Sequence, residues 1–233
     1  MRQRSVAWDK DEDAGVEFVE VSLAADALSA TGVAIGGEPV AYRLDYTLET
    51  GQGFVTTRLH VTACGEGWRR TLDLCRGGSG DWTASVTAEG HAPESLDMPG
   101  GGSGRSSDEA SESDRAGGPG DRAAGSGGPD GRLWRFAGSL DCDLGLSPIT
   151  NSMPVLRHRL LEDDASVDLL MAWVSVPDLG VHPSRQRYTA VRDLPDGNRL
   201  IRFESLDSTF MAELIFDRDG LVVDYPGIGR RLG

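Results

Sequence analysis

Polar side chains whose types could bind or convert a small molecule gather in the C-terminal half of the chain. Asp141 and Asp143 flank a cysteine, and arginine, glutamine and tyrosine alternate over 185–188. Guanidinium forks bind carboxylate, phosphate or sugar hydroxyls, while glutamine and tyrosine supply neutral donors and acceptors. These residue types indicate a site for a polar or anionic group. The predicted ligand-binding residues are Arg58, Asn151, Arg157, Arg159, Gln186, Arg187, Tyr188 and Tyr225.

A structural role competes with ligand binding for the arginines. A buried guanidinium without a partner is costly, so Arg157 or Arg159, if enclosed by the fold, must meet an acid or a ligand anion. Asp141, Asp143 and Asp224 are the candidate acids. Because buried charges are usually paired, the structural ion pair is favoured over the ligand site.

The remaining candidates also have two interpretations each. Asp141 and Asp143 could serve acid–base chemistry or hold a cation, or they could cap a helix and pair with arginines, which is favoured. Asn151 lies just before Met153-Pro154, where a turn is favoured over a ligand contact. Tyr225 could stack on a sugar or acyl group, although aromatic residues belong to the core more often.

Motifs for catalysis and for cofactors are lacking in the sequence. The four histidines show no metal-ligand spacing, and there is neither a phosphate-binding loop nor a Gly-x-Ser-x-Gly elbow. We therefore expect no catalytic residue, no cofactor and no metal. The alternative is an enzyme that acts on a small anionic molecule through Asp141 or Asp143, with Arg157 and Arg187 clamping the anion.

Charge excludes some partners. The formal net charge is −14, and Lys10 is the only lysine among 23 lysine and arginine residues. Phosphate backbones and anionic lipid surfaces need a concentrated basic surface, so we expect neither nucleic acid nor simple electrostatic membrane docking. An acidic chain with arginine in place of lysine favours a protein from a salty or GC-rich host, and thus salt adaptation.

The elements that position these residues are expected to form one domain over residues 1–233. Residues 92–132 are rich in Gly, Ser and Asp with only two large apolar side chains, which predicts a disordered insertion. The three cysteines suggest no disulfide framework, and neither a signal-peptide core nor a membrane span is evident. These features predict a cytoplasmic protein.

Alternation of apolar and polar residues, rich in β-branched and aromatic side chains, predicts strands on both sides of the insertion. The expected strands are 17–23, 31–35, 40–48, 53–63, 68–75, 81–88, 133–137, 167–176, 187–191, 199–204, 210–216 and 221–224. Tight-turn residues such as Gly36-Gly37 separate them, which favours a mostly antiparallel meander. A single helix is expected within Pro148–Leu161, plugging the inside of a curled sheet.

Ordered motifs along nearly the whole chain resemble those of the putative glycolipid-binding family. In the N-terminal half they comprise Val6, Trp8, Gly32, Ile35-Gly36, Tyr42-Arg43-Leu44, Thr57-Arg58, Gly80 and Trp82. In the C-terminal half they comprise residues 140–144, 147–154, 176–179, 186–189 and 220–227. The insertion falls outside the resemblance, and Phe54 stands where a tryptophan is expected.

The resemblance implies a fold and a function. The fold is a spiral β-roll, a many-stranded antiparallel sheet curled around a single α-helix, often assembled as a homodimer. The function is non-catalytic binding of a glycolipid or another amphiphile, with its tail in an apolar interior and its head on the Arg/Gln/Tyr cluster. A scaffold without a pocket is a further alternative.

Overall fold

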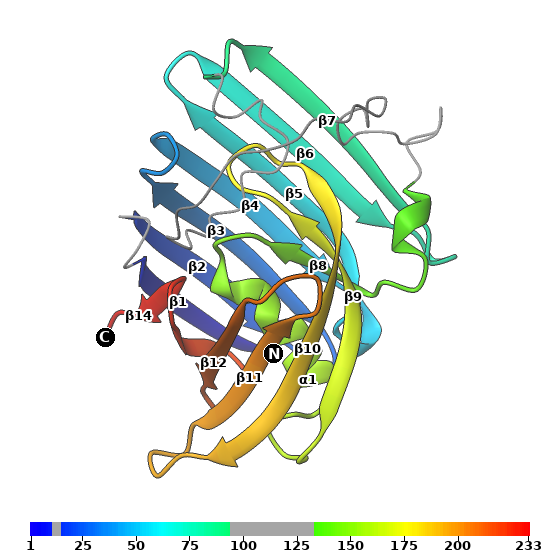
Figure 1. The fold of residues 1–233 in the computed structure, drawn as a ribbon, viewed down its shortest axis with the longest axis vertical. Helices are drawn as coiled ribbons and strands as arrows, with labels where there is room; N and C mark the ends of the chain where they lie inside the picture. The colour runs from blue at the N-terminus through cyan, green and yellow to red at the C-terminus, as the bar shows by residue number, and fades with distance from the viewer. Residues whose placement is uncertain (11–14, 94–132) are drawn as a thin grey trace, which may run out of the picture.

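The computed structural model of the chain describes residues 1–10, 15–93 and 133–233. The predicted insertion at 92–132 lies outside these ranges except for Ala92 and Pro93. Within the described residues the protein is mostly β, with one short α-helix beside a single sheet of 14 strands that does not close on itself (Figure 1). None of its helices there has the length and apolar character needed to cross a bilayer.

The first half of the chain is an antiparallel meander. Its strands are β1 (Arg2–Lys10), β2 (Gly15–Leu23), β3 (Leu28–Gly36), β4 (Tyr42–Thr50), β5 (Thr56–Gly65), β6 (Trp68–Arg76) and β7 (Trp82–Gly90). Period-2 alternation places one set of side chains inside, as the buried Leu28 and Ala30 of β3 show beside the exposed Ser29 and Thr31. The meander was predicted from this pattern.

The second half of the chain forms the rest of the same sheet. Its strands are β8 (Asp141–Leu144), β9 (Ser166–Val174), β10 (Val181–Asp193), β11 (Arg199–Ser205), β12 (Met211–Phe216), β13 (Val222–Tyr225) and β14 (Gly229–Arg231), with β8 at the edge opposite β7. β1 pairs with β14, with Trp8 opposite Arg231, so the first and last strands of the chain are neighbours in the middle of the sheet (Figure 1). All neighbouring strands are antiparallel except β8 and β9, which makes the sheet mixed.

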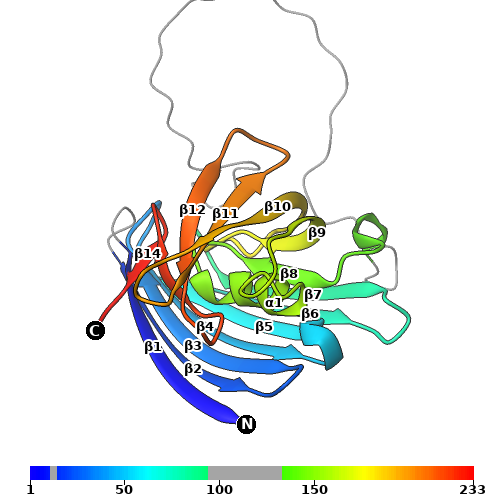
Figure 2. The ribbon, with the colours of Figure 1, turned by 90° about the horizontal axis from the view of Figure 1, so that it is seen from below.

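The sheet curves, and β8 and α1 (Ser152–Arg157) lie on its concave side (Figure 2). The N–H of Thr56, at the start of β5, donates to Leu140 O at 3.0 Å, and the N–H of Cys142 in β8 donates to Thr56 Oγ1 at 3.1 Å. These bonds join segments that are far apart in the strand order. Trp8, fully buried, joins β1 to β13 by donating its indole N–H to Val222 O at 2.9 Å.

The prediction of one short helix within 148–161 is confirmed. A 3₁₀ turn, η4 (Pro148–Asn151), leads directly into α1. Proline at the first position of the turn lacks the N–H that would have no partner there, and its fixed φ suits the start of a helix. The helix ends at Arg157 with His158 as its C-cap, and Arg159 follows with a φ of 55°, a left-handed value at which a helix does not continue.

Two predicted strands need correction. Residues 133–137 are not a strand but contain the 3₁₀ turn η3 (Trp134–Phe136), because the N–H groups of Phe136 and Ser139 each bond a carbonyl three residues back. Residues 53–55, placed in a strand by their apolar character, belong to the turn η1 (Gln52–Phe54) and the residue after it. In both places local hydrogen bonds replaced the pairing that the composition favoured.

Candidate functional site

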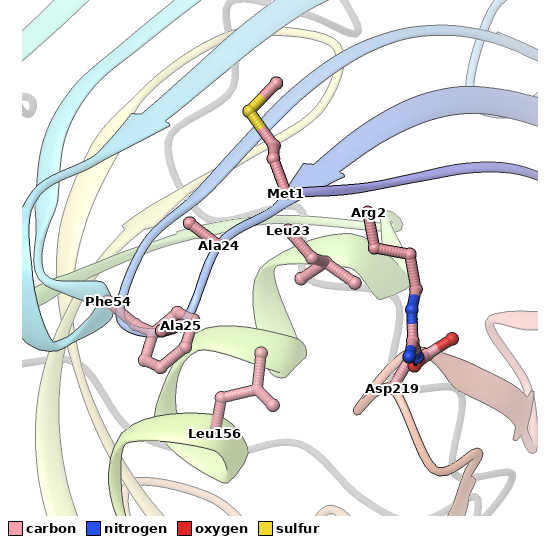
Figure 3. Close-up of a pocket in the computed structure, with 8 residues that line it drawn as sticks. All are labelled: Met1, Arg2, Leu23, Ala24, Ala25, Phe54, Leu156 and Asp219. Carbon is pink, nitrogen blue, oxygen red and sulfur yellow. Dashed lines mark hydrogen bonds and ion pairs between the residues drawn. The ribbon is translucent and has the colours of Figure 1, made fainter.

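A pocket of about 490 Å³ opens where β1 begins and β2 ends (Figure 3). Its lining residues are Met1, Arg2, Leu23, Ala24, Ala25, Phe54, Leu156 and Asp219. They come from the start of β1 and the residue before it, the end of β2, the turn between β2 and β3, η1, α1 and the turn between β12 and β13. Six of the eight are apolar, and the volume lies within the roughly 300–1,000 Å³ of small-molecule sites.

Phe54 reaches the pocket from a strained backbone. Its φ of 58° lies in the left-handed region, which costs a non-glycine residue about 1–3 kcal/mol. Its N–H donates to Asp26 O at 2.9 Å, which holds η1 against the turn between β2 and β3. Strain of this kind persists only where the surrounding structure maintains it. The position of the Phe54 ring is therefore a feature that the fold enforces.

Leu156 lies in the pocket wall because a glycine stands beside it. A Cβ atom on Gly220 would come within 2.6 Å of Leu156 Cδ2, closer than side chains tolerate. Gly220 also has a φ of 75°, which only glycine adopts readily. The tight turn that carries Asp219 into the pocket and the packing of α1 thus depend on the same glycine.

An ion-pair network forms the polar wall of the pocket. Asp219 accepts from Arg2 through Oδ1 and from Arg4 through Oδ2. Asp217 lies 3.3 Å from Arg4 Nη2 and accepts from Arg231 Nη1 at 2.7 Å. The other oxygen of Asp217 accepts the N–H groups of Asp219 and Leu221, so the turn that supports the network is itself held in place.

Four of the eight predicted ligand-binding residues lie inside the fold near one another. The hydroxyl of Tyr188 donates to Asn151 Oδ1 at 2.8 Å and lies 3.2 Å from Gln186 Oε1. Tyr225 joins them through Phe203, whose ring centroid lies 5.3 Å from that of Tyr188 and 6.1 Å from that of Tyr225. Tyr188 and Gln186 are almost fully buried, and their polar atoms are satisfied by one another and by Asn151 and Asp143.

Arg157 forms a structural ion pair, the interpretation that the sequence favoured over ligand binding. Its two Nη atoms donate to the two carboxylate oxygens of Asp141, which is 1% exposed. Burial raises the pKa of the Asp141 carboxyl, and the Arg157 guanidinium opposes that increase. The bidentate geometry makes this a strong pair on the inner side of β8.

The other three arginines lie at the surface with acidic partners. Arg58 pairs with Asp73, and Arg187 pairs with Asp168, both through two nitrogens. Arg159 contacts Glu162 and Asp163, three and four residues along the chain. Arg58, Arg159 and Arg187 are thus separated from the inner cluster. None of the eight predicted residues lines the pocket, and their ligand-binding role stays a prediction.

Asp143 is the second acid of β8 and has neutral partners. Thr150 donates to its Oδ1 at 2.9 Å and Gln186 to its Oδ2 at 2.7 Å, and no ion pair reaches it within the described residues. Burial raises the pKa of the Asp143 carboxyl, while these two hydrogen bonds oppose the shift. Its environment thus disfavours the ionised form.

Replacing Asp143 with asparagine is expected to stabilise the protein more at neutral than at acidic pH. A folded pKa above the ordinary 3.8 means that the wild type loses stability as the pH rises through that folded value. The variant has no such loss, so its stability relative to the wild type should rise between pH 4 and 7. Urea denaturation at both values measures this, and an advantage independent of pH would contradict it.

Sequence reasoning missed the residues that line the pocket. Phe54 gave the one available signal, as the position where the family resemblance led to the expectation of a tryptophan. For metal ions, no group of three His, Cys, Asp or Glu side chains converges within residues 1–10, 15–93 and 133–233.

The fold and the site together define a β-rich protein with an open curved sheet and a pocket at one end. The chain belongs to the putative glycolipid-binding family, whose model matches residues 5–231. A crystal structure of a DUF1089 family protein from Pseudomonas aeruginosa is similar, at 24% identity and a TM-score of 0.61, over 93% of this chain and 92% of that one. This likeness shows a shared fold. No curated protein matches the chain.

Proposed function

We propose that the protein binds an amphiphile, a glycolipid in the sense of the family name, without chemical conversion. The observation that carries the proposal is the combination within one pocket of an apolar lining, including Phe54 and Leu156, and a charged wall at Arg2 and Asp219. Such a pocket suits a ligand with an acyl part and a polar head. The family name supports the same class of ligand.

The fold proposed to hold the ligand is the spiral β-roll around α1. The curvature of the sheet and the position of α1 on its concave side support it (Figure 2). In this arrangement α1 contributes Leu156 to the pocket and Arg157 to the ion pair with Asp141, so one short helix connects the ligand site with the core.

An enzymatic function has less support. It required Arg157 and Arg187 to clamp a small anion near Asp141 or Asp143. Arg157 instead binds Asp141, and Arg187 pairs with Asp168 at the surface. A scaffold without a pocket has less support because of the cavity beside Leu156.

Lipid analysis of the protein purified from its own host tests the proposal directly. We expect an amphiphile in near-stoichiometric amount, seen by native mass spectrometry and identified after solvent extraction. An empty protein that takes up no amphiphile on incubation would overturn the proposal.

Filling the pocket supplies a second test that spares the core. Ala24 lies in the exposed turn between β2 and β3 and lines the pocket, so Ala24→Trp adds a ring there without removing buried atoms. We expect the variant to bind decyl glucoside at least about tenfold more weakly, by titration calorimetry, since the tail loses its space. Ala41→Trp, in the exposed turn before β4, is the matched control and should bind as the wild type does.

A further inference from the structure

The ion-pair network beside the pocket carries more positive than negative charge in an acidic protein. The chain carries a formal charge of −14, yet among the described residues this network joins Arg2, Arg4 and Arg231 to two carboxylates, those of Asp217 and Asp219. Three guanidinium groups against two carboxylates leave one positive charge in excess. A local excess opposite in sign to the whole molecule attracts an anion to this place in preference to the rest of the surface.

Two of the three arginines have their donors occupied by the protein. Arg231 donates to Asp217 and to the carbonyl oxygens of Leu221 and Val222, and its side chain is 14% exposed. Arg4 donates to both Asp217 and Asp219. These two arginines hold the turn and the network in place, and they offer little to a ligand.

Arg2 differs because it has donors to spare. It lines the pocket, its side chain is 67% exposed, and within the described part of the chain only its Nη1 atom donates to a protein group, Asp219 Oδ1. Nε and Nη2 form the other edge of the planar guanidinium, whose paired N–H groups match two oxygens of a carboxylate, phosphate or sulfate. Asp219 is anchored in turn by Arg4, so it holds Arg2 beside the apolar lining (Figure 3).

We propose that the ligand of this pocket carries an anionic head group, a phosphate, sulfate or carboxylate, which binds the open edge of Arg2 while the tail occupies the apolar lining. This inference rests on the proposed amphiphile binding and narrows it to anionic amphiphiles. Because Arg2 is already oriented by Asp219, less side-chain freedom is lost on binding than for an unanchored surface arginine.

Titration calorimetry with three probes tests the inference. Decyl phosphate supplies tail and anion, decyl glucoside the same tail with a neutral head, and inorganic phosphate the anion alone. We expect decyl phosphate to bind at least about tenfold more tightly than either of the others. Arg2→Gln should weaken the binding of decyl phosphate about tenfold and change the affinity for decyl glucoside less than about twofold.

Arg43→Gln is the matched control. Arg43 is a similarly exposed arginine, with a side chain 61% exposed and one carboxylate partner, Asp45, but it lies on β4 away from the pocket lining. It should leave all affinities unchanged. Because both arginines are exposed, both variants are expected to fold, and their melting curves verify this.

The contrary outcomes separate the two proposals. Equal affinity for decyl phosphate and decyl glucoside, unaffected by Arg2→Gln, would overturn the anionic head group and leave amphiphile binding intact. Binding of inorganic phosphate as tight as that of decyl phosphate would overturn the role of the tail and make the wall a plain anion site. No binding of either decyl compound would overturn amphiphile binding and this inference together.

Discussion

Replacing Arg157 with methionine is expected to lower the free energy of unfolding by about 3–5 kcal/mol, because it leaves the Asp141 carboxylate buried without its cation. Asp141 is 1% exposed, and the side chain of Arg157 is 11% exposed. Equilibrium urea denaturation at neutral pH measures the loss. Loss of the guanidinium also raises the pKa of Asp141 further, since Arg157 is the largest influence that lowers it.

The loss should therefore shrink as the pH falls. Once Asp141 binds a proton, the buried group is neutral and the penalty for its unpaired charge disappears. Asp141→Asn combined with Arg157→Met should recover most of the lost stability at neutral pH, because it removes the unpaired charge. Methionine is chosen because it keeps much of the volume of the arginine stem.

Arg187→Met is the matched control for Arg157→Met. Arg187 also holds an aspartate through two nitrogens, but its side chain is 40% exposed and that of Asp168 is 53% exposed. Solvent screening leaves such an exposed pair only a small contribution to stability. If Arg157→Met were no more harmful than Arg187→Met, the pair between β8 and α1 would have to be solvated in solution, contrary to the structure.

Replacing Lys10 with methionine is expected to cost a similar 3–5 kcal/mol, because Glu17 would lose its only cation partner among the described residues. Lys10 is 2% exposed and Glu17 is fully buried. Tyr46 and Ser147 each donate to Glu17 Oε1 at 2.6 Å, whereas Oε2 lies 3.3 Å from Lys10 Nζ and accepts no hydrogen bond within that part of the chain. Urea denaturation measures the loss.

The double variant Lys10→Met, Glu17→Gln provides the control for that loss. It removes both charges and keeps an oxygen that Tyr46 and Ser147 can reach, so it should be far less destabilised than Lys10→Met alone. Equal losses in the single and double variants would mean that packing around Lys10, and not its charge, supplies the stability.

Acylation provides an independent measure of the same site, because Lys10 is the only lysine in the sequence. A buried amine reacts with an amine-specific acylating reagent only when the structure opens around it. We expect acylation of Lys10 in the folded wild type to be at least a hundredfold slower than in urea, as followed by mass spectrometry of the peptide that contains it. Equal rates in both conditions would contradict its burial.

Much of the fold could be predicted because its elements obey local rules. The alternation in β2, β3 and β6 is visible in the chain itself, since a strand with one buried face must place apolar residues at every second position. Pro148, at the first turn, predicted the helix from local sequence in the same way. The strand prediction was wrong at residues 133–137 and at Phe54. Short runs of large apolar residues suit 3₁₀ turns as well as strands, and local hydrogen bonds decide between the two.

The candidate site could be predicted much less well than the fold. Asn151, Gln186 and Tyr188 lie together in the structure, and their role in ligand binding stays a prediction. Arg187 is separated from Gln186 because successive side chains of β10 point to opposite sides of the sheet, and Arg58, Arg157 and Arg159 lie elsewhere in the chain. Residue type indicated which side chains could bind an anion, and it carried no information on which of them a pocket would expose.

The amino-acid sequence by itself determined the β-rich character, the single short helix and the family, because alternation, turn residues and ordered motifs act over a few neighbouring positions. Only the tertiary structure decided that β1 pairs with β14, and that Arg2, Leu23, Phe54, Leu156 and Asp219 line one pocket. These residues come from five separate places in the chain. Their meeting depends on strand order, on sheet curvature and on Gly220, whose missing side chain lets Leu156 approach the turn that carries Asp219.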